Sequence, residues 1–160
     1  MNDASDTQDE PTVLYVHFDE GCTEENYPEL LELLADLTPV VQALPPDAAL
    51  ADVRGALRYF RRSPQDLAGA LRVRSLALYD VDCTVGVAAN PLLARMAAAD
   101  GPPGAVRHLP DRPDAVAGFL DRTPVAALQG VGPATARTLC GYGLDTVGRL
   151  AAAPPATLQR

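Results

Sequence analysis

Residues 128–139, LQGVGPATARTL, constrain the fold of this chain more than any other stretch. Two glycines, Gly130 and Gly132, flank one apolar residue in this stretch. Pro133 follows where a helix can begin, because the N–H that proline lacks has no helical partner at that position. The run 124–128 can form a short helix before the glycines. The sequence therefore predicts a helix-hairpin-helix.

A Gly-x-Gly turn in this position is suited to binding an anion. Its free backbone N–H groups lie at a helix N-terminus, which stabilises negative charge. On DNA, such a site contacts a phosphate without reading the base sequence. The structural alternative is a plain turn between two helices with a glycine at the corner. The residues that we predict to contact DNA are Gly130, Val131, Gly132, Thr135 and Arg137.

Length and composition favour one domain with a small appendage. The chain has 160 residues, 48% of them hydrophobic and none of them Trp, so we expect a core of Ala, Leu and Val. No segment approaches the roughly 18 apolar residues of a membrane span, and the polar, acidic N-terminus does not resemble a secretory signal. Cys22, Cys83 and Cys140 form neither a metal-binding spacing nor a disulfide framework. We expect a cytoplasmic protein with no membrane partner.

The charge is unevenly distributed along the chain. Residues 1–53 hold 13 acidic side chains and no Lys or Arg, whereas residues 54–160 hold all 13 arginines and eight acidic residues. The net charge of −8 argues against nucleic acid binding over the whole surface, but the basic part can bind it locally. One group of arginines forms either a patch for phosphate or a solvated charged edge: Arg54, Arg58, Arg61 and Arg62.

The order of predicted elements indicates an α/β (α+β) fold. Strands are expected at residues 12–18, 39–44, 48–53, 83–87 and 105–109. Helices are expected at residues 28–37, 63–78, 90–96 and 113–122. The first six elements, within residues 12–87, fit a ferredoxin-like, palm-type sheet with helices on one face. A helix, a strand and a further helix follow, and then the helix-hairpin-helix. We predict a disordered acidic tail at 1–11, a palm-like domain at 12–122 and the hairpin module at 123–160.

Four runs of the chain, in the same order, resemble the Y-family (UmuC-like) translesion DNA polymerases. The runs are 13–19 (first palm strand), 44–53 (second acidic motif), 85–97 (strand and helix behind the triphosphate), and 130–132 with 143–150 (thumb hairpin). The resemblance covers about residues 12–158. It implies a role in translesion synthesis or DNA repair, with DNA as the partner. It also implies that Arg95 is the basic residue that contacts the nucleotide triphosphate.

The resemblance breaks down where the family performs its chemistry. Family members hold two metal ions with three carboxylates, one on the first strand and an adjacent Asp-Glu pair on the second. Here His17 replaces the first carboxylate, Asp47 keeps the second and Ala48 replaces the third. His17 is either an unusual ligand or a strand-end histidine in a vacated site, and Asp47 is either a weak Mg²⁺ ligand or a solvated loop residue. The family's gating aromatic residue falls at Cys22, and only 30 residues separate His17 from Asp47, too few for the fingers.

These departures predict a catalytically inactive, shortened family member, a pseudoenzyme that binds DNA non-specifically in DNA repair or damage tolerance. No cofactor is expected, and Mg²⁺ only if residual activity exists. Two alternatives stay open. The chain could be a protein–protein module that binds other repair or replication proteins, or a residual DNA-directed DNA polymerase.

Overall fold

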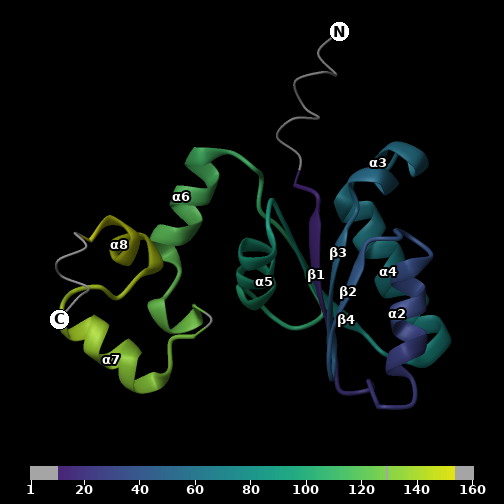
Figure 1. Ribbon diagram of the computed structural model, residues 1–160, viewed down its shortest axis with the longest axis horizontal. Coiled ribbons are helices and arrows are strands. Elements are labelled where there is room, and N and C mark those ends of the chain that lie inside the picture. Colours follow the sequence, from purple (N-terminus) through teal and green to yellow (C-terminus); the bar gives the residue numbers. More distant parts are fainter. Residues whose placement is uncertain (1–10, 129, 154–160) are drawn as a thin grey trace, which may run out of the picture. The chain divides into compact units, whose positions relative to one another are not determined.

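The computed structural model describes residues 11–128 and 130–153, which belong to two compact units, 1–111 and 112–160. The first unit contains a mixed β-sheet covered by helices, and the second is helical (Figure 1). The predicted α/β class with a palm-type sheet is confirmed. The predicted disorder of the acidic tail concerns residues that, except for Pro11, lie outside the described part.

Five strands form the sheet of the first unit, in the order β2-β3-β1-β4-β5. They are β1 (Val13–Phe18), β2 (Val41–Leu44), β3 (Ala48–Asp52), β4 (Cys83–Ala88) and β5 (Val106–His108). Neighbouring strands are antiparallel except β4 and β5, which are parallel. The central strand, β1, lies between β3 and β4, so both of its edges are hydrogen-bonded. All five predicted strands are therefore present, most of them shorter than predicted.

The hydrophobic core of the first unit lies on one face of the sheet. Alternation along β1 directs Leu14, Val16 and Phe18 to this face, where each is at most 1% exposed. Helices α2 (Tyr27–Ala35) and α4 (Pro64–Tyr79) cover it. Their largest fully buried side chains are Leu30, Leu34, Leu67 and Leu71. Each such side chain contributes roughly 1.5–3 kcal/mol of burial free energy, so this layer stabilises the sheet.

The opposite face of the sheet carries α5 (Pro91–Ala99), which lies on the other side of β1 from α2 and α4 (Figure 1). The two helices of the ferredoxin-like part, α2 and α4, share one face as expected, and α5, which follows that part in the chain, covers the other face. Gly86 in β4 explains the close approach of α5. A Cβ at this position would overlap the carbonyl oxygen of Ala94 and lie 2.6 Å from the amide nitrogen of Ala98. A glycine inside a strand often marks such an approach of another backbone segment.

Side-chain caps fix the starts of α4 and α5. The Ser63 hydroxyl accepts a hydrogen bond from the Asp66 N–H at 3.1 Å, and the Asn90 side chain accepts one from the Leu93 N–H at 2.9 Å. A proline follows each cap, at a position where its missing N–H is not needed. Both helix starts agree with the sequence prediction, because the cap and the proline are local signals.

One helix, α3 (Arg54–Phe60), is not predicted from the sequence. It follows β3 directly, and its N-cap, Val53, provides no side-chain hydrogen bond. Ala56 is its one buried residue, so no apolar stripe marks it in the sequence. The helix ends where Arg61 adopts the left-handed conformation, with φ of 53°. Neither end therefore carries a sequence signal for a helix.

The second unit consists of α6 (Pro113–Arg122), the 3₁₀ turn η1 (Val125–Ala127), α7 (Pro133–Gly141) and α8 (Val147–Ala152). Helix α6 packs against α8, which assigns α6 to this unit. The unit thus begins at Arg112, whereas the sequence places the module boundary between residues 122 and 123. None of the helices in the described part of the chain combines the length and hydropathy needed to span a membrane.

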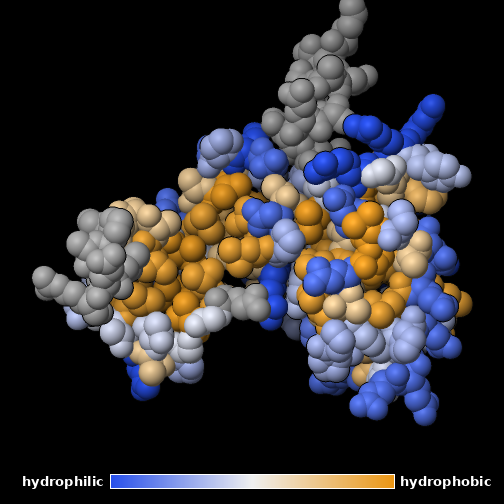
Figure 2. Space-filling view, in the orientation of Figure 1, coloured by the Kyte–Doolittle hydropathy of each residue, from blue (hydrophilic) through white to orange (hydrophobic). Residues whose placement is uncertain are grey.

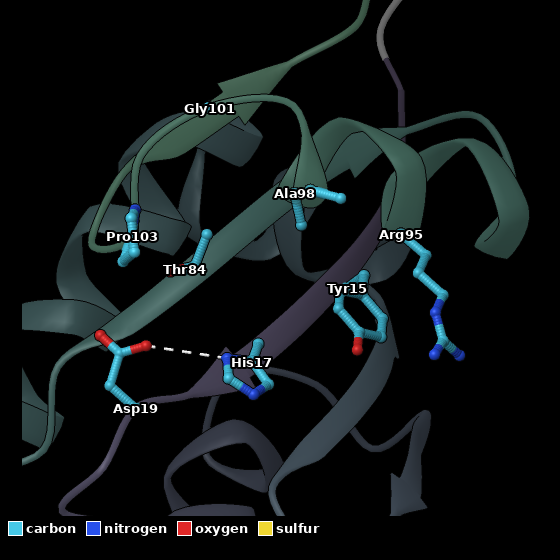
Figure 3. Close-up of a pocket in the computed structure, with 9 residues that line it drawn as sticks. Tyr15, His17, Asp19, Thr84, Arg95, Ala98, Gly101 and Pro103 are labelled. Carbon is cyan, nitrogen blue, oxygen red and sulfur yellow. Dashed lines mark ion pairs between the residues drawn. The ribbon is translucent and has the colours of Figure 1, made fainter. Parts of the chain in front are cut away.

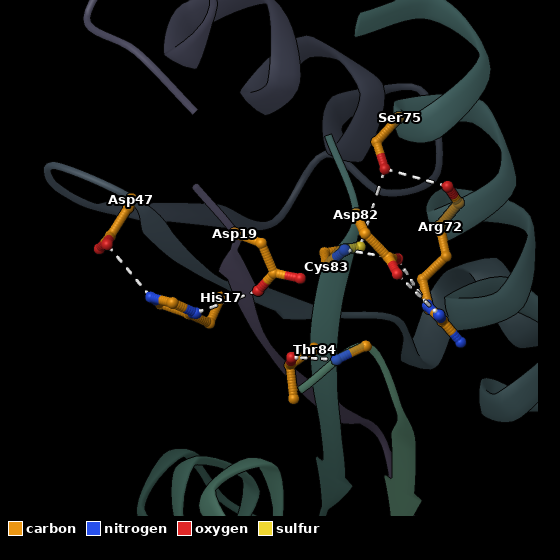
Figure 4. Close-up of polar contacts among 9 residues, drawn as sticks. His17, Asp19, Asp47, Arg72, Ser75, Asp82, Cys83 and Thr84 are labelled. Carbon is orange, nitrogen blue, oxygen red and sulfur yellow. Dashed lines mark hydrogen bonds and ion pairs between the residues drawn. The ribbon is translucent and has the colours of Figure 1, made fainter. Parts of the chain in front are cut away.

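An ion pair connects α4 to the start of β4. Arg72 donates two hydrogen bonds to Asp82, from Nε to Oδ1 at 3.0 Å and from Nη2 to Oδ2 at 3.1 Å (Figure 4). The Cys83 N–H also donates to Oδ1, at 2.8 Å. Arg72 lowers the pKa of Asp82 below its ordinary value of 3.8. The pair is half-buried and bidentate, a geometry that stabilises a fold more than a single exposed ion pair.

We expect Arg72→Gln to lower the free energy of unfolding by about 1–2 kcal/mol at neutral pH. A lowered folded-state pKa means that the stabilisation by Asp82 is present above pH 3.8 and is lost as the pH falls through the folded-state value. The difference in free energy of unfolding between the native chain and Arg72→Gln should therefore become smaller below pH 3.8. Urea unfolding of both proteins, at neutral pH and at pH values below 3.8, measures this difference.

Arg74→Gln, on the same helix, is the matched control. Arg74 makes one hydrogen bond, of 3.2 Å, to the exposed Asp36, so its loss should change the free energy of unfolding by less than about 0.5 kcal/mol. If both variants lowered the free energy of unfolding equally, the role assigned to the Arg72–Asp82 pair would be contradicted. The same holds if the loss of stability in Arg72→Gln did not vary with pH.

Candidate functional site

A pocket of about 400 Å³ opens beside α5, on the face of the sheet opposite the main core. Tyr15 and His17 line it because they alternate with the core residues of β1 (Figure 3). Thr84 on β4 is the register partner of His17 and faces the same pocket. Asp19 and Arg95 complete the polar part of the lining. The pocket therefore combines acidic, basic and aromatic groups.

His17 lies between two carboxylates at the end of β1. Its Nε2 is 3.1 Å from Oδ2 of Asp47, and its Nδ1 is 3.7 Å from Oδ1 of Asp19 (Figure 4). A neutral imidazole has one N–H, so only the protonated ring can direct a donor toward both carboxylates. The imidazole thus occupies the space between the carboxylates of Asp19 and Asp47.

The structure brings together the three positions that the sequence singles out for metal chemistry. His17 and Ala48 are register partners in the antiparallel pair β1–β3, so their side chains share one face. Asp47 precedes Ala48 in the turn between β2 and β3, and its carbonyl accepts a hydrogen bond from the Phe18 N–H at 2.8 Å. Ala48 is 5% exposed, so a methyl group fills the third position.

The residues of this cluster do not fit a two-metal centre. Such a centre needs several carboxylate oxygens converging on hard cations. Here the Asp47 carboxylate contacts the His17 imidazole instead of converging with other carboxylates. Burial and the nearby charge of Asp82 raise the pKa of Asp19, although His17 and Arg72 act in the opposite direction. Within residues 11–128 and 130–153, no group of three or more His, Cys, Asp or Glu side chains is placed to hold a metal ion.

Arg95 projects from α5 at the edge of the pocket (Figure 3). Its guanidinium carbon lies 5.6 Å from the centroid of the Tyr15 ring, in cation–π range. The sequence identifies Arg95 but gives no role to Tyr15, although the period-two alternation of β1 places it beside His17. Cys22, the predicted gate position, lies near Asp47, with its Sγ 3.9 Å from the carbonyl oxygen of Pro46.

Two exposed glycines, Gly130 and Gly132, lie between η1 and α7 in the second unit. Gly130 has φ of 91°, a left-handed conformation that favours glycine. Gly132 is the N-cap of α7, with an ordinary φ of −78°, and no side chain caps this helix. A Cβ at either glycine would meet no atom of the described structure within 4 Å. Thr135 and Arg137, in the first turns of α7, are exposed.

Comparison with known proteins identifies the family to which this chain belongs. Residues 3–99 match the impB/mucB/samB family model. The chain therefore belongs to this UmuC-like, or Y-family, group of proteins, and the resemblance found in the sequence is confirmed.

Individual relatives are members of the same family, and a solved structure shares the fold. The chain is 35% identical over 130 residues to DNA polymerase IV 2 of Mesorhizobium japonicum, which covers 81% of this chain and 31% of that protein. It is 32% identical over 132 residues to DNA polymerase IV 1 of Halalkalibacterium halodurans, with coverage of 82% and 31%. The insertion ternary complex of Dbh DNA polymerase superposes with a TM-score of 0.74 at 23% identity, covering 85% of this chain and 39% of that one. This chain spans about a third of the length of the curated relatives.

Proposed function

We propose that this chain is a catalytically inactive Y-family protein that binds DNA without sequence preference and acts in DNA damage tolerance or repair. The observation that carries the proposal is His17, which lies between Asp47 and Asp19 where the family requires a metal-binding carboxylate. DNA as the partner is supported by the relatives, which are named as DNA polymerases.

The inactivity follows from charge and shape at the end of the sheet. The chemistry of the family needs cations that neutralise the phosphates of an incoming nucleotide. An imidazole at His17 competes for the Asp47 carboxylate, and the methyl group of Ala48 offers no ligand. Arg95 keeps a positive charge at the edge of the pocket, so a phosphate can still be attracted there without reacting.

DNA binding is assigned to the Gly130–Gly132 turn. The fold does not require glycine at position 132, because φ is ordinary and the space around a Cβ is open. A ligand that approaches the backbone closely is a physical reason for glycine there. The uncapped N–H groups at the start of α7 would face a DNA phosphate, with Thr135 and Arg137 beside it. So few contacts predict weak and salt-sensitive binding.

We expect Gly132→Ala to raise the dissociation constant for DNA about five- to tenfold while leaving the fold intact, because the added methyl group obstructs the phosphate. Fluorescence anisotropy of a labelled primer–template, titrated at low and at moderate salt, measures the change. Gly141→Ala, at the far end of α7, meets nothing within 4 Å and should bind like the native chain. Native affinity in a folded Gly132→Ala variant would contradict the assignment of the turn.

A further inference from the structure

Four arginines lie on α3 or directly after it. Arg54 and Arg58 lie on the helix and Arg61 and Arg62 follow it, and all four are exposed. Within the described part of the chain, none of them forms a salt bridge, whereas Arg72, Arg74, Arg107 and Arg149 each do. Hydrophilic side chains gather over α3 in Figure 2. The sequence alone does not decide whether these arginines form a patch that binds phosphate or a solvated charged edge.

Aromatic side chains interrupt this basic region. Tyr59 is 82% exposed and Phe60 is 41% exposed, with their ring centroids 5.0 Å apart. Beside them lies a groove of about 290 Å³ whose wall includes Leu37, Pro39 and Ala56. Exposed aromatic rings next to an apolar groove favour an occupant over a purely solvated edge. We call Arg54, Arg58, Tyr59, Arg61 and Arg62 the α3 basic surface.

The chain itself supplies a segment of opposite charge. Residues 1–10, MNDASDTQDE, contain four acidic side chains and no Lys or Arg. The chain enters the described structure at Pro11, and the carbonyl of Thr12 accepts a hydrogen bond of 2.9 Å from the N–H of Val53. Val53 is the N-cap of α3. The acidic segment is therefore attached to the fold directly beside the start of α3.

Length and charge both allow this segment to cover the α3 basic surface. A helix of seven residues is about 10 Å long, whereas ten extended residues span up to about 33 Å. Four negative side chains meet four positive ones, and the short tether gives an effective concentration in the millimolar range. Exposed ion pairs are weak and screened by salt, so the contact would be reversible.

We propose that residues 1–10 dock on the α3 basic surface of their own chain. The acidic segment then shields these arginines from other anions, and an anionic partner must displace it to reach them. This contact lies in the first unit and does not depend on DNA binding by the hairpin or on the absence of catalysis.

The chain contains no Trp, so Tyr59→Trp places a single fluorophore on the proposed surface. Acrylamide quenching of this residue is compared between the full chain and a second variant in which the segment is neutral. The neutralising substitutions are Asp3→Asn, Asp6→Asn, Asp9→Asn and Glu10→Gln. We expect the quenching constant to rise about twofold on neutralisation, and to rise similarly in the acidic chain at high salt. Leu78→Trp, at the exposed far end of α4, is the control and should not respond.

Equal quenching of the tryptophan at position 59 in the acidic and the neutralised chains would overturn the proposal. A short single-stranded oligonucleotide gives a second readout. It should protect this tryptophan more strongly in the neutralised chain, because the competing segment has lost its charge. Equal protection in both chains would assign the surface to nucleic acid alone and would also overturn the proposal. The first comparison contains no DNA, so its failure is distinguishable from a failure of the proposed function.

Discussion

Gly86→Ala is expected to lower the free energy of unfolding of the first unit by about 3–5 kcal/mol. The new Cβ would overlap the carbonyl oxygen of Ala94 and lie 2.6 Å from the amide nitrogen of Ala98. Both are backbone atoms of α5, so no side chain can rotate away and the helix must move off the sheet. Urea unfolding followed by far-ultraviolet circular dichroism measures the loss.

Gly69→Ala is the matched control for this prediction. Gly69 lies in α4, where a Cβ meets nothing within 4 Å, and alanine is favoured over glycine in a helix. This substitution should therefore raise the free energy of unfolding by about 0.5–1 kcal/mol. A loss of less than about 1 kcal/mol for Gly86→Ala would show that α5 does not approach the sheet as closely as described.

The double variant His17→Asp with Ala48→Glu is expected to create a metal site where β1 ends and β3 begins. The two positions are register partners at the end of β1 and β3, and Asp47 is adjacent to Ala48. Three carboxylates would then converge on one point, and the histidine that contacts Asp47 would be removed. We expect the double variant to bind Mn²⁺ at least about tenfold more tightly than the native chain.

Isothermal titration with Mn²⁺ measures this gain. His108→Asp is a useful control, because it exchanges the same residue types on β5, away from the cluster. That variant should bind Mn²⁺ no more tightly than the native chain. If the native chain bound Mn²⁺ as tightly as the double variant does, this result would contradict the view that His17 and Ala48 have removed the metal site.

Local signals explain which parts of the fold could be predicted. Ser63 and Asn90 mark helix starts through their own caps, so α4 and α5 follow from a few neighbouring residues. Helix α3 carries no such cap. The close approach of α5 to the sheet depends on Gly86, whose role becomes visible only when the packing of α5 on β4 is known.

The candidate site shows the same division between local and long-range information. His17, Asp47 and Ala48 are identified by their order along the chain, but the 3.1 Å contact between His17 and Asp47 depends on how β1 and β3 pair. The contact between Arg95 and Tyr15 depends on where α5 crosses β1. Sequence therefore identifies the altered positions, while register determines which side chains meet.

Primer extension by the purified chain tests the central claim most directly. We expect no template-directed extension of a primer with either Mg²⁺ or Mn²⁺ and all four deoxynucleotides, because His17 and Ala48 leave Asp47 as the one family carboxylate. Extension that Asp47→Ala abolishes would contradict this claim and would identify the chain as an active polymerase.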